Sequence, residues 1–71
     1  MSTRDRVRAL LAEVADAPAT DAAPLTIDSL GLVQLVESLE DAFAMRVAAK
    51  EVTRENFGSV DTIVAFVETK T

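Results

Sequence analysis

Apolar residues recur at the spacing of an α-helix along most of this 71-residue chain, and this pattern restricts the fold to a helical one. The spacing predicts long helices over about residues 3–15, 28–44 and 60–69. A shorter helical segment is predicted over residues 51–57, closed by Gly58. The apolar residues that define the three long stripes are Val7, Leu10, Leu11, Val14, Leu32, Leu35, Val36, Leu39, Phe43, Val60, Ile63, Val64 and Val67.

The helical pattern stops between residues 16 and 28. Prolines and small residues fill this stretch, which predicts a long loop rather than a linker between domains. Leu25 and Ile27 are apolar, so we expect them to hold the loop against the helices. We therefore predict one domain over residues 1–71. Its fold class is all-α, a four-helix bundle with three main helices, a short third helix and a long loop between the first two.

Several reactive side chains are missing, because the chain contains no cysteine, histidine, tryptophan or tyrosine. Without imidazole there is no base for Ser–His–Asp or Cys–His catalysis. Zinc and copper sites need thiolate or imidazole, so only a cation site built from oxygen ligands remains. The absence of cysteine also excludes disulfides and gives no sign of an oxidising compartment. We therefore predict a protein that is not an enzyme and that holds no metal.

A chain of 71 residues is near the lower limit for a domain that folds around one core without disulfides or a metal. A hydrophobic content of 49% suits that requirement. No apolar run approaches the roughly 20 residues that cross a bilayer, and the first residues are polar, unlike a signal peptide. The sequence predicts a soluble, cytoplasmic, monomeric protein.

Acidic residues are concentrated in the middle of the chain, whose net charge is −5. Residues 9–45 contain seven of the twelve acidic residues and none of the seven basic ones. Such a segment repels phosphate backbones and anionic lipid and attracts basic protein surfaces, so we expect neither nucleic acid nor membrane as a partner. An acidic surface that only keeps a small protein soluble remains the alternative.

The predicted second helix has an acidic face opposite its apolar stripe. At about 100° per residue, Leu30 lies on this face, away from the core. An exposed leucine among carboxylates resembles a small apolar anchor with a charged rim, although single exposed leucines also occur without a function. We expect the carboxylates to be solvated, which argues against acid–base catalysis by them. The candidate docking residues are Leu30, Val33, Gln34, Glu37, Glu40 and Asp41.

Ser29 opens the predicted second helix, between Asp28 and Leu30. Asp28 and Ser29 are both good N-cap residues, and capping alone would explain a serine here. A hydroxyl at a helix N-terminus also suits a phosphate ester, because free N–H groups and the helix dipole favour an anion. Gly31 costs roughly 0.5–1 kcal/mol relative to alanine in a helix, and one use for it is to clear space beside Ser29.

These residues together resemble the acyl carrier proteins, specifically the small stand-alone carriers of the phosphopantetheine-attachment superfamily. The tripeptide around Ser29 stands where the family has its attachment motif, and an acidic second helix of matching length follows it. The resemblance covers about residues 25–67. Its segments are Asp28-Ser29-Leu30, Leu32 to Phe43, Glu51 to Phe57 and Val60 to Val64.

The resemblance implies a bundle of the acyl-carrier type in which Ser29 receives 4′-phosphopantetheine from coenzyme A through a phosphopantetheinyl transferase. The thiol of that arm would hold an acyl or aminoacyl group as a thioester, so the cofactor would supply the sulfur that the chain lacks. Asp28 and Leu30 would flank the attachment site. The acidic helix face would dock an acyl- or aminoacyl-loading enzyme and the downstream synthase or tailoring enzymes.

Five residues depart from the pattern of the carriers of fatty acid synthesis. Gly31 and Gln34 stand where those carriers often have acidic residues, and Glu37 stands where they often have methionine. Ala48 and Arg54 stand where related carriers often have proline. In having glutamine at position 34, the chain resembles D-alanyl carriers and other free-standing carriers that accept an activated amino acid or small acid. These departures favour a specialised pathway, such as polyketide or nonribosomal peptide biosynthesis.

An unmodified acidic helical module for protein–protein interaction is the alternative hypothesis. Exposed Leu30 and Val33 among carboxylates would also suit a surface that binds a partner without any cofactor. An enzymatic interpretation rests only on carboxylates and hydroxyls. The two main hypotheses differ at Ser29, because only the carrier needs its hydroxyl.

Overall fold

The computed structural model describes residues 2–71, which form four α-helices and one 3₁₀ turn and contain no strand. The predicted all-α class is confirmed, and so is a long loop between the first two helices. No helix within these residues is long and apolar enough to cross a membrane. The elements are α1 (Thr3–Leu11), α2 (Ser29–Phe43), the 3₁₀ turn η1 (Ala49–Glu51), α3 (Arg54–Phe57) and α4 (Val60–Lys70).

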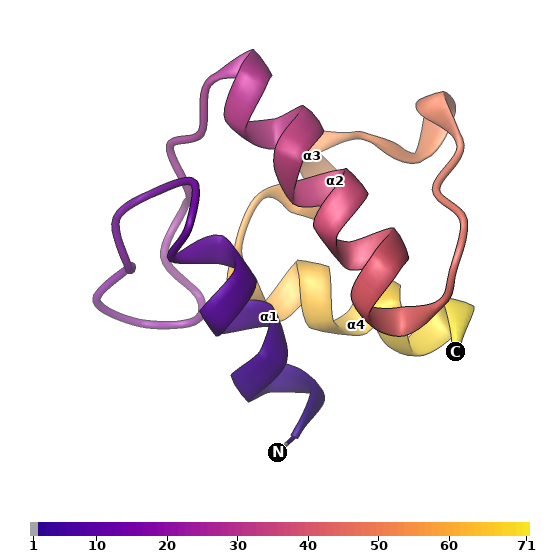
Figure 1. Cartoon of the computed structure of the whole chain (residues 1–71). Helices are drawn as coiled ribbons and strands as arrows, with labels where there is room; N and C mark the ends of the chain where they lie inside the picture. The colour runs from indigo at the N-terminus through magenta and orange to yellow at the C-terminus, as the bar shows by residue number, and fades with distance from the viewer. Residues whose placement is uncertain (1) are drawn as a thin grey trace.

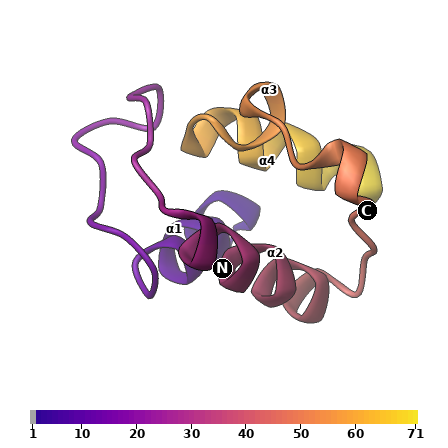
Figure 2. The same ribbon diagram turned by 90° about the horizontal axis from the view of Figure 1, so that it is seen from above.

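The helices form two layers (Figure 2), one with α1 beside α2 and the other with α3 beside α4. α1 also packs against α4, so the first and last helices join the layers, and α2 runs across the front of the molecule in Figure 1. Each of the four helices contributes to a single core, and the predicted stripes face it. The buried hydrophobic residues are Val7, Leu11, Leu35, Leu39, Met45, Phe57, Val60, Ile63, Val64, Phe66 and Val67.

Hydroxyl groups cap the first and last helices. The Ser2 hydroxyl accepts a hydrogen bond of 3.1 Å from the Asp5 N–H at the start of α1. At α4 the Ser59 hydroxyl accepts from the Thr62 N–H at 3.2 Å, and the Thr62 hydroxyl accepts from the Ser59 N–H at 3.0 Å. These bonds satisfy N–H groups that a helix leaves without a partner in its first turn. The predicted cap at Ser59 is confirmed.

The first helix is shorter than predicted. It ends at Leu11 rather than near residue 15. Beyond its end, the Glu13 N–H donates to the Leu10 carbonyl at 3.2 Å and the Val14 N–H donates to the Leu11 carbonyl at 3.0 Å. This i to i+3 pattern tightens the last turn and leads the chain into the loop. Val14 still packs against the core, so its apolar spacing indicated burial without a continuous α-helix.

The segment predicted as a helix over residues 51–57 is broken in two. Thr53 has an extended backbone and caps α3, its hydroxyl accepting from the Asn56 N–H at 3.2 Å, so the α-helix starts only after it. Gly58 ends α3 as predicted, but its φ of −79° is not left-handed. Glycine suits this position because a Cβ atom there would lie 2.5 Å from the Arg54 carbonyl oxygen.

Ala44 ends α2 in the left-handed region, with φ 51° and ψ 47°, the one non-glycine residue among residues 2–71 with a positive φ. A Cβ atom costs about 1 kcal/mol in this conformation, whereas glycine adopts it freely. We expect Ala44→Gly to raise the free energy of unfolding by about 1 kcal/mol in urea denaturation. The control Ala65→Gly, at an exposed position inside α4, should lower it by a similar amount. Equal destabilisation by both substitutions would contradict the prediction.

Candidate functional site

Ser29 is the first residue of α2 and is exposed, at the point where the long loop meets the helix. The cap of this helix is Asp28, whose carboxylate accepts a hydrogen bond of 2.7 Å from the Gly31 N–H. Of the two possible caps, the structure therefore uses the aspartate. Among residues 2–71, no hydrogen bond engages the Ser29 hydroxyl, which leaves that oxygen open to solvent.

The surroundings of the Ser29 hydroxyl suit an anion. The N–H groups of Ser29 and Leu30 lie in the first turn of a 15-residue helix, where no carbonyl of the same helix can reach them. The helix dipole places partial positive charge at this end. The Asp28 carboxylate is held by the Gly31 N–H, which offsets part of the repulsion it would exert on a neighbouring phosphate.

Gly31 makes room for the cap and the loop rather than for Ser29. A Cβ atom at Gly31 would lie 3.0 Å from the Asp28 carboxylate oxygen and 3.0 Å from the Ile27 side chain. The Val14 carbonyl oxygen would be 3.5 Å away, so the end of the α1 turn also passes close by. The prediction that Gly31 clears space beside Ser29 is therefore replaced by a packing role beside Asp28, Ile27 and the Val14 carbonyl.

The predicted docking face is exposed along most of α2. Leu30 and Val33 are the exposed large hydrophobic residues among residues 2–71, with 68% and 53% of their surface accessible. Gln34, Glu37 and Asp41 are also exposed, so five of the six predicted docking residues are accessible to a partner. They present an apolar end near Ser29 and an acidic end farther along the helix.

Glu40 differs from the other five predicted docking residues. It is only partly exposed, and its carboxylate accepts a hydrogen bond of 2.9 Å from the Val47 N–H. The expectation of a fully solvated carboxylate is therefore wrong for Glu40, because the chain after α2 turns back toward it. This side chain stabilises the connector between α2 and η1.

Two hollows lie between α2 and the segment that leads into α3. One, of about 300 Å³, is lined by Ile27 and Leu32 on one side and by Val52 and Phe57 on the other. The second, of about 270 Å³, is lined mainly by apolar side chains and shares Leu32 and Val52 with the first. Val52 was not predicted at the site: the sequence placed it in a short helix over residues 51–57, whereas it lies in the connector between η1 and α3 and faces α2 across these hollows.

A third hollow, of about 470 Å³, lies at the C-terminal half of α2 and is lined by Glu37, Glu40, Asp41 and Arg46 among others. Within residues 2–71, no group of three or more acidic side chains is placed to hold a metal ion. Arg46 brings a positive charge to this hollow, and Glu40 is engaged with the backbone. Glu37 and Asp41 therefore remain as exposed charges beside Arg46 at this hollow.

Asp21 belongs to the acidic middle of the sequence, but its charge is matched in the structure. Its carboxylate accepts a hydrogen bond of 2.7 Å from Arg4 and another from Arg8. The bond from Arg4 lowers the pKa of Asp21 below its ordinary value, burial opposes this effect, and Arg8 lowers the pKa further. The negative charge at the surface therefore comes mainly from residues other than Asp21, including the exposed carboxylates of α2.

Comparisons of the chain with protein-family models, with curated proteins and with solved structures gave no match. What the structure defines is a small all-helical protein with an exposed serine at the head of an acidic helix.

Proposed function

We propose that the protein is a carrier of the acyl-carrier type that bears 4′-phosphopantetheine on Ser29. The observation that carries the proposal is the exposed hydroxyl of Ser29 in the first turn of α2, between the capping Asp28 and the exposed Leu30. A transferase needs access to this oxygen, and Asp28 rather than Ser29 caps the helix. The chain has no thiol of its own, so a carrier function would require a thiol supplied by a cofactor.

The residues around Ser29 fit a phosphodiester. In the transfer, the Ser29 oxygen would form a bond to the β-phosphorus of coenzyme A, the bond from that phosphorus to the 3′-phosphoadenosine phosphate would break, and the hydroxyl proton would pass to a base of the transferase. The N–H groups of the first turn would then face the phosphate. When attached, the arm supplies a thiol that holds an acyl or aminoacyl group as a thioester.

Partner enzymes would dock on α2. The exposed Leu30 and Val33 offer an apolar anchor next to the attachment site, and Glu37 and Asp41 offer charge for a basic partner. The partners are a phosphopantetheinyl transferase, a loading enzyme and downstream synthase or tailoring enzymes of a specialised pathway in the cytoplasm. Polyketide or nonribosomal peptide biosynthesis is the class that the departures from fatty-acid carriers favour.

Incubation with coenzyme A and a promiscuous phosphopantetheinyl transferase tests the proposal by intact mass. We expect a gain of one phosphopantetheine group in the native protein and none in Ser29→Ala. Ser38→Ala, in the same helix, is the matched control and should be modified like the native protein. An unmodified native protein, under conditions that fully load a known carrier, would overturn the proposal.

The exposed pair Leu30 and Val33 also favours a second candidate, an acidic interaction module that acts without a cofactor. In that case Ser29→Ala should leave binding of a partner and biological activity unchanged, whereas Leu30→Ala should weaken binding. Loss of activity in Ser29→Ala, with an unchanged circular dichroism spectrum, would contradict this second candidate.

A further inference from the structure

Residues 12–28 form the loop between α1 and α2, and this loop contributes less to the buried core than the helices do. None of the buried hydrophobic residues of the core lies in this loop. Val14, Ala15, Leu25 and Ile27 pack against the core but are only partly buried. Segments with few buried contacts open at a lower free-energy cost than the global unfolding of a protein. The free-energy cost of separating the loop from the helices therefore depends on these partly buried contacts and on the polar contacts of the loop.

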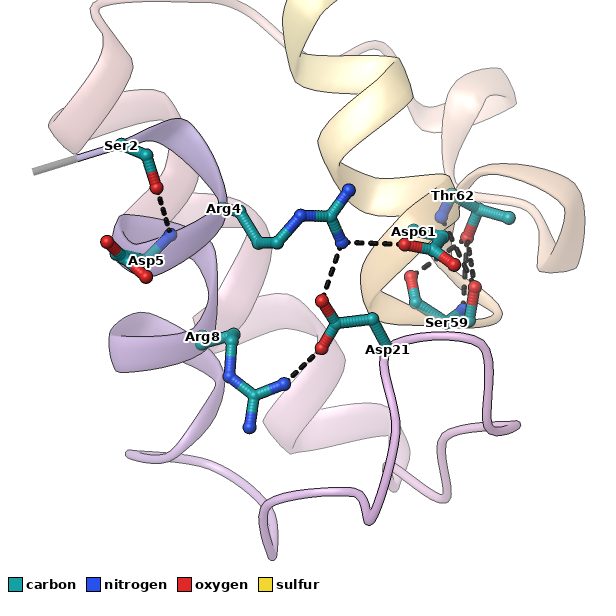
Figure 3. Close-up of polar contacts among 8 residues, drawn as sticks. All are labelled: Ser2, Arg4, Asp5, Arg8, Asp21, Ser59, Asp61 and Thr62. Atoms are coloured by element: carbon teal, nitrogen blue, oxygen red, sulfur yellow. Dashed lines mark hydrogen bonds and ion pairs between the residues drawn. The ribbon is translucent and has the colours of Figure 1, made fainter.

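The strongest polar anchor is Asp21, which joins the loop to both layers (Figure 3). Arg4 of α1 donates to the Asp21 carboxylate at 2.7 Å and to the Asp61 carboxylate of α4 at 2.6 Å, and Arg8 of α1 donates to the other Asp21 oxygen. The backbone carbonyl of Asp21 also accepts from the Asp61 N–H at 3.0 Å. One residue of the loop thus contacts the first and last turns of α1 and the first turn of α4.

Beyond Asp21, the loop ends on the wall of the hollow beside α2. The Leu25 N–H donates to the Gly58 carbonyl at 2.9 Å, and Pro24, Leu25 and Ile27 line the hollow of about 300 Å³. Two residues after Ile27 the chain reaches Ser29. Any movement of the loop therefore alters both the wall of this hollow and the chain that leads into α2.

We propose that residues 12–28 form a strap latched by Asp21, which opens while the four helices remain packed. The latch is electrostatic: the charged groups that face the Asp21 carboxylate are Arg4 and Arg8 from α1, and Asp61 from α4 shares Arg4 with it. These side chains are partly exposed, so salt weakens their attraction. Protonation of Asp21 removes the negative charge, so the latch holds at neutral pH and is lost in acid. The strap does not depend on modification of Ser29.

Hydrogen–deuterium exchange at neutral pH tests the strap with two variants of equal charge change. Asp21→Asn removes the latch, whereas Asp16→Asn neutralises an exposed aspartate of the same loop that forms no ion pair among residues 2–71. We expect exchange over residues 12–28, and at the Leu25 amide in particular, to be about three- to tenfold faster in Asp21→Asn than in Asp16→Asn. In the native protein, the Leu25 amide should exchange with a lower opening free energy than the buried turns of α2 and α4, and its exchange should depend less on added urea.

A second arm uses the native protein and Arg8→Gln, which removes one partner of Asp21 and leaves the Arg4 contacts in place. Added salt should speed loop exchange in the native protein and have a smaller effect in Asp21→Asn, and Arg8→Gln should fall between the two. Equal loop exchange in Asp21→Asn and Asp16→Asn would overturn the proposal. Equal opening free energies and equal urea dependence for the Leu25 amide and the buried turns of α2 and α4 would also overturn it, because the loop would then open only when the whole domain unfolds.

Discussion

Leu39→Ala is expected to lower the free energy of unfolding by about 3 kcal/mol, because it leaves a cavity in a core that cannot fully collapse around it. Leu39 is fully buried in α2 and belongs to the one core that α1, α2, α3 and α4 share. Domains of this size have only about 5 kcal/mol of stability, so the variant should retain about 2 kcal/mol at room temperature. Urea denaturation followed by circular dichroism measures the change.

Leu30→Ala is the matched control, since it makes the same chemical change in the same helix at a side chain that is 68% exposed. Its effect on the free energy of unfolding should stay within about 0.5 kcal/mol. Similar losses of stability in the two variants would mean that the faces of α2 are not arranged as described.

Glu37→Lys is expected to slow modification of the protein by a phosphopantetheinyl transferase by about tenfold at low salt, and by less at high salt. This prediction depends on the proposed carrier function. Glu37 is exposed on the face that carries Leu30, so reversing its charge should weaken long-range attraction of a basic partner without unfolding the domain. Initial rates from intact mass at two salt concentrations provide the measurement.

Glu68→Lys makes the same charge change at an exposed position on α4 and should retain nearly the native rate. Equal rates for Glu37→Lys and Glu68→Lys at low salt would contradict a specific docking face. Glu40→Lys is not an equivalent test, because it also removes the acceptor of the Val47 N–H and should lower stability by about 1 kcal/mol.

The parts of the fold that the sequence predicted well depend on local patterns. The apolar stripe of α2 and the serine cap of α4 were predicted because both involve residues within one or two turns of each other. The exposure of Leu30 and Val33 followed from the same helical geometry. The position of Ser29 at the head of α2 was also predicted, although its neighbour rather than Ser29 itself caps the helix.

The parts that were not predicted depend on contacts between residues distant in the sequence, or on competition between local backbone structures of similar stability. Asp21 meets Arg4 only after the chain has folded back over a separation of 17 residues, and Arg4 meets Asp61 across 57. Glu40 reaches the Val47 backbone because of the left-handed turn that follows α2, which no periodic pattern encodes. The break before α3 reflects a cap at Thr53 that competes with a continuous helix.

The helix α4 supplies five of the eleven buried hydrophobic residues found in residues 2–71, and it packs directly against α1 at the other end of the sequence. A chain that emerges from the ribosome without α4 would leave the apolar face of α1 uncovered where α4 packs against it, and the shared core would lack the five buried residues of α4. The contact between α1 and α4 brings together segments that are separated by the whole chain between Leu11 and Val60. Folding must then wait for these distant segments to meet. The domain should therefore acquire its structure in a single cooperative step once α4 has been synthesised.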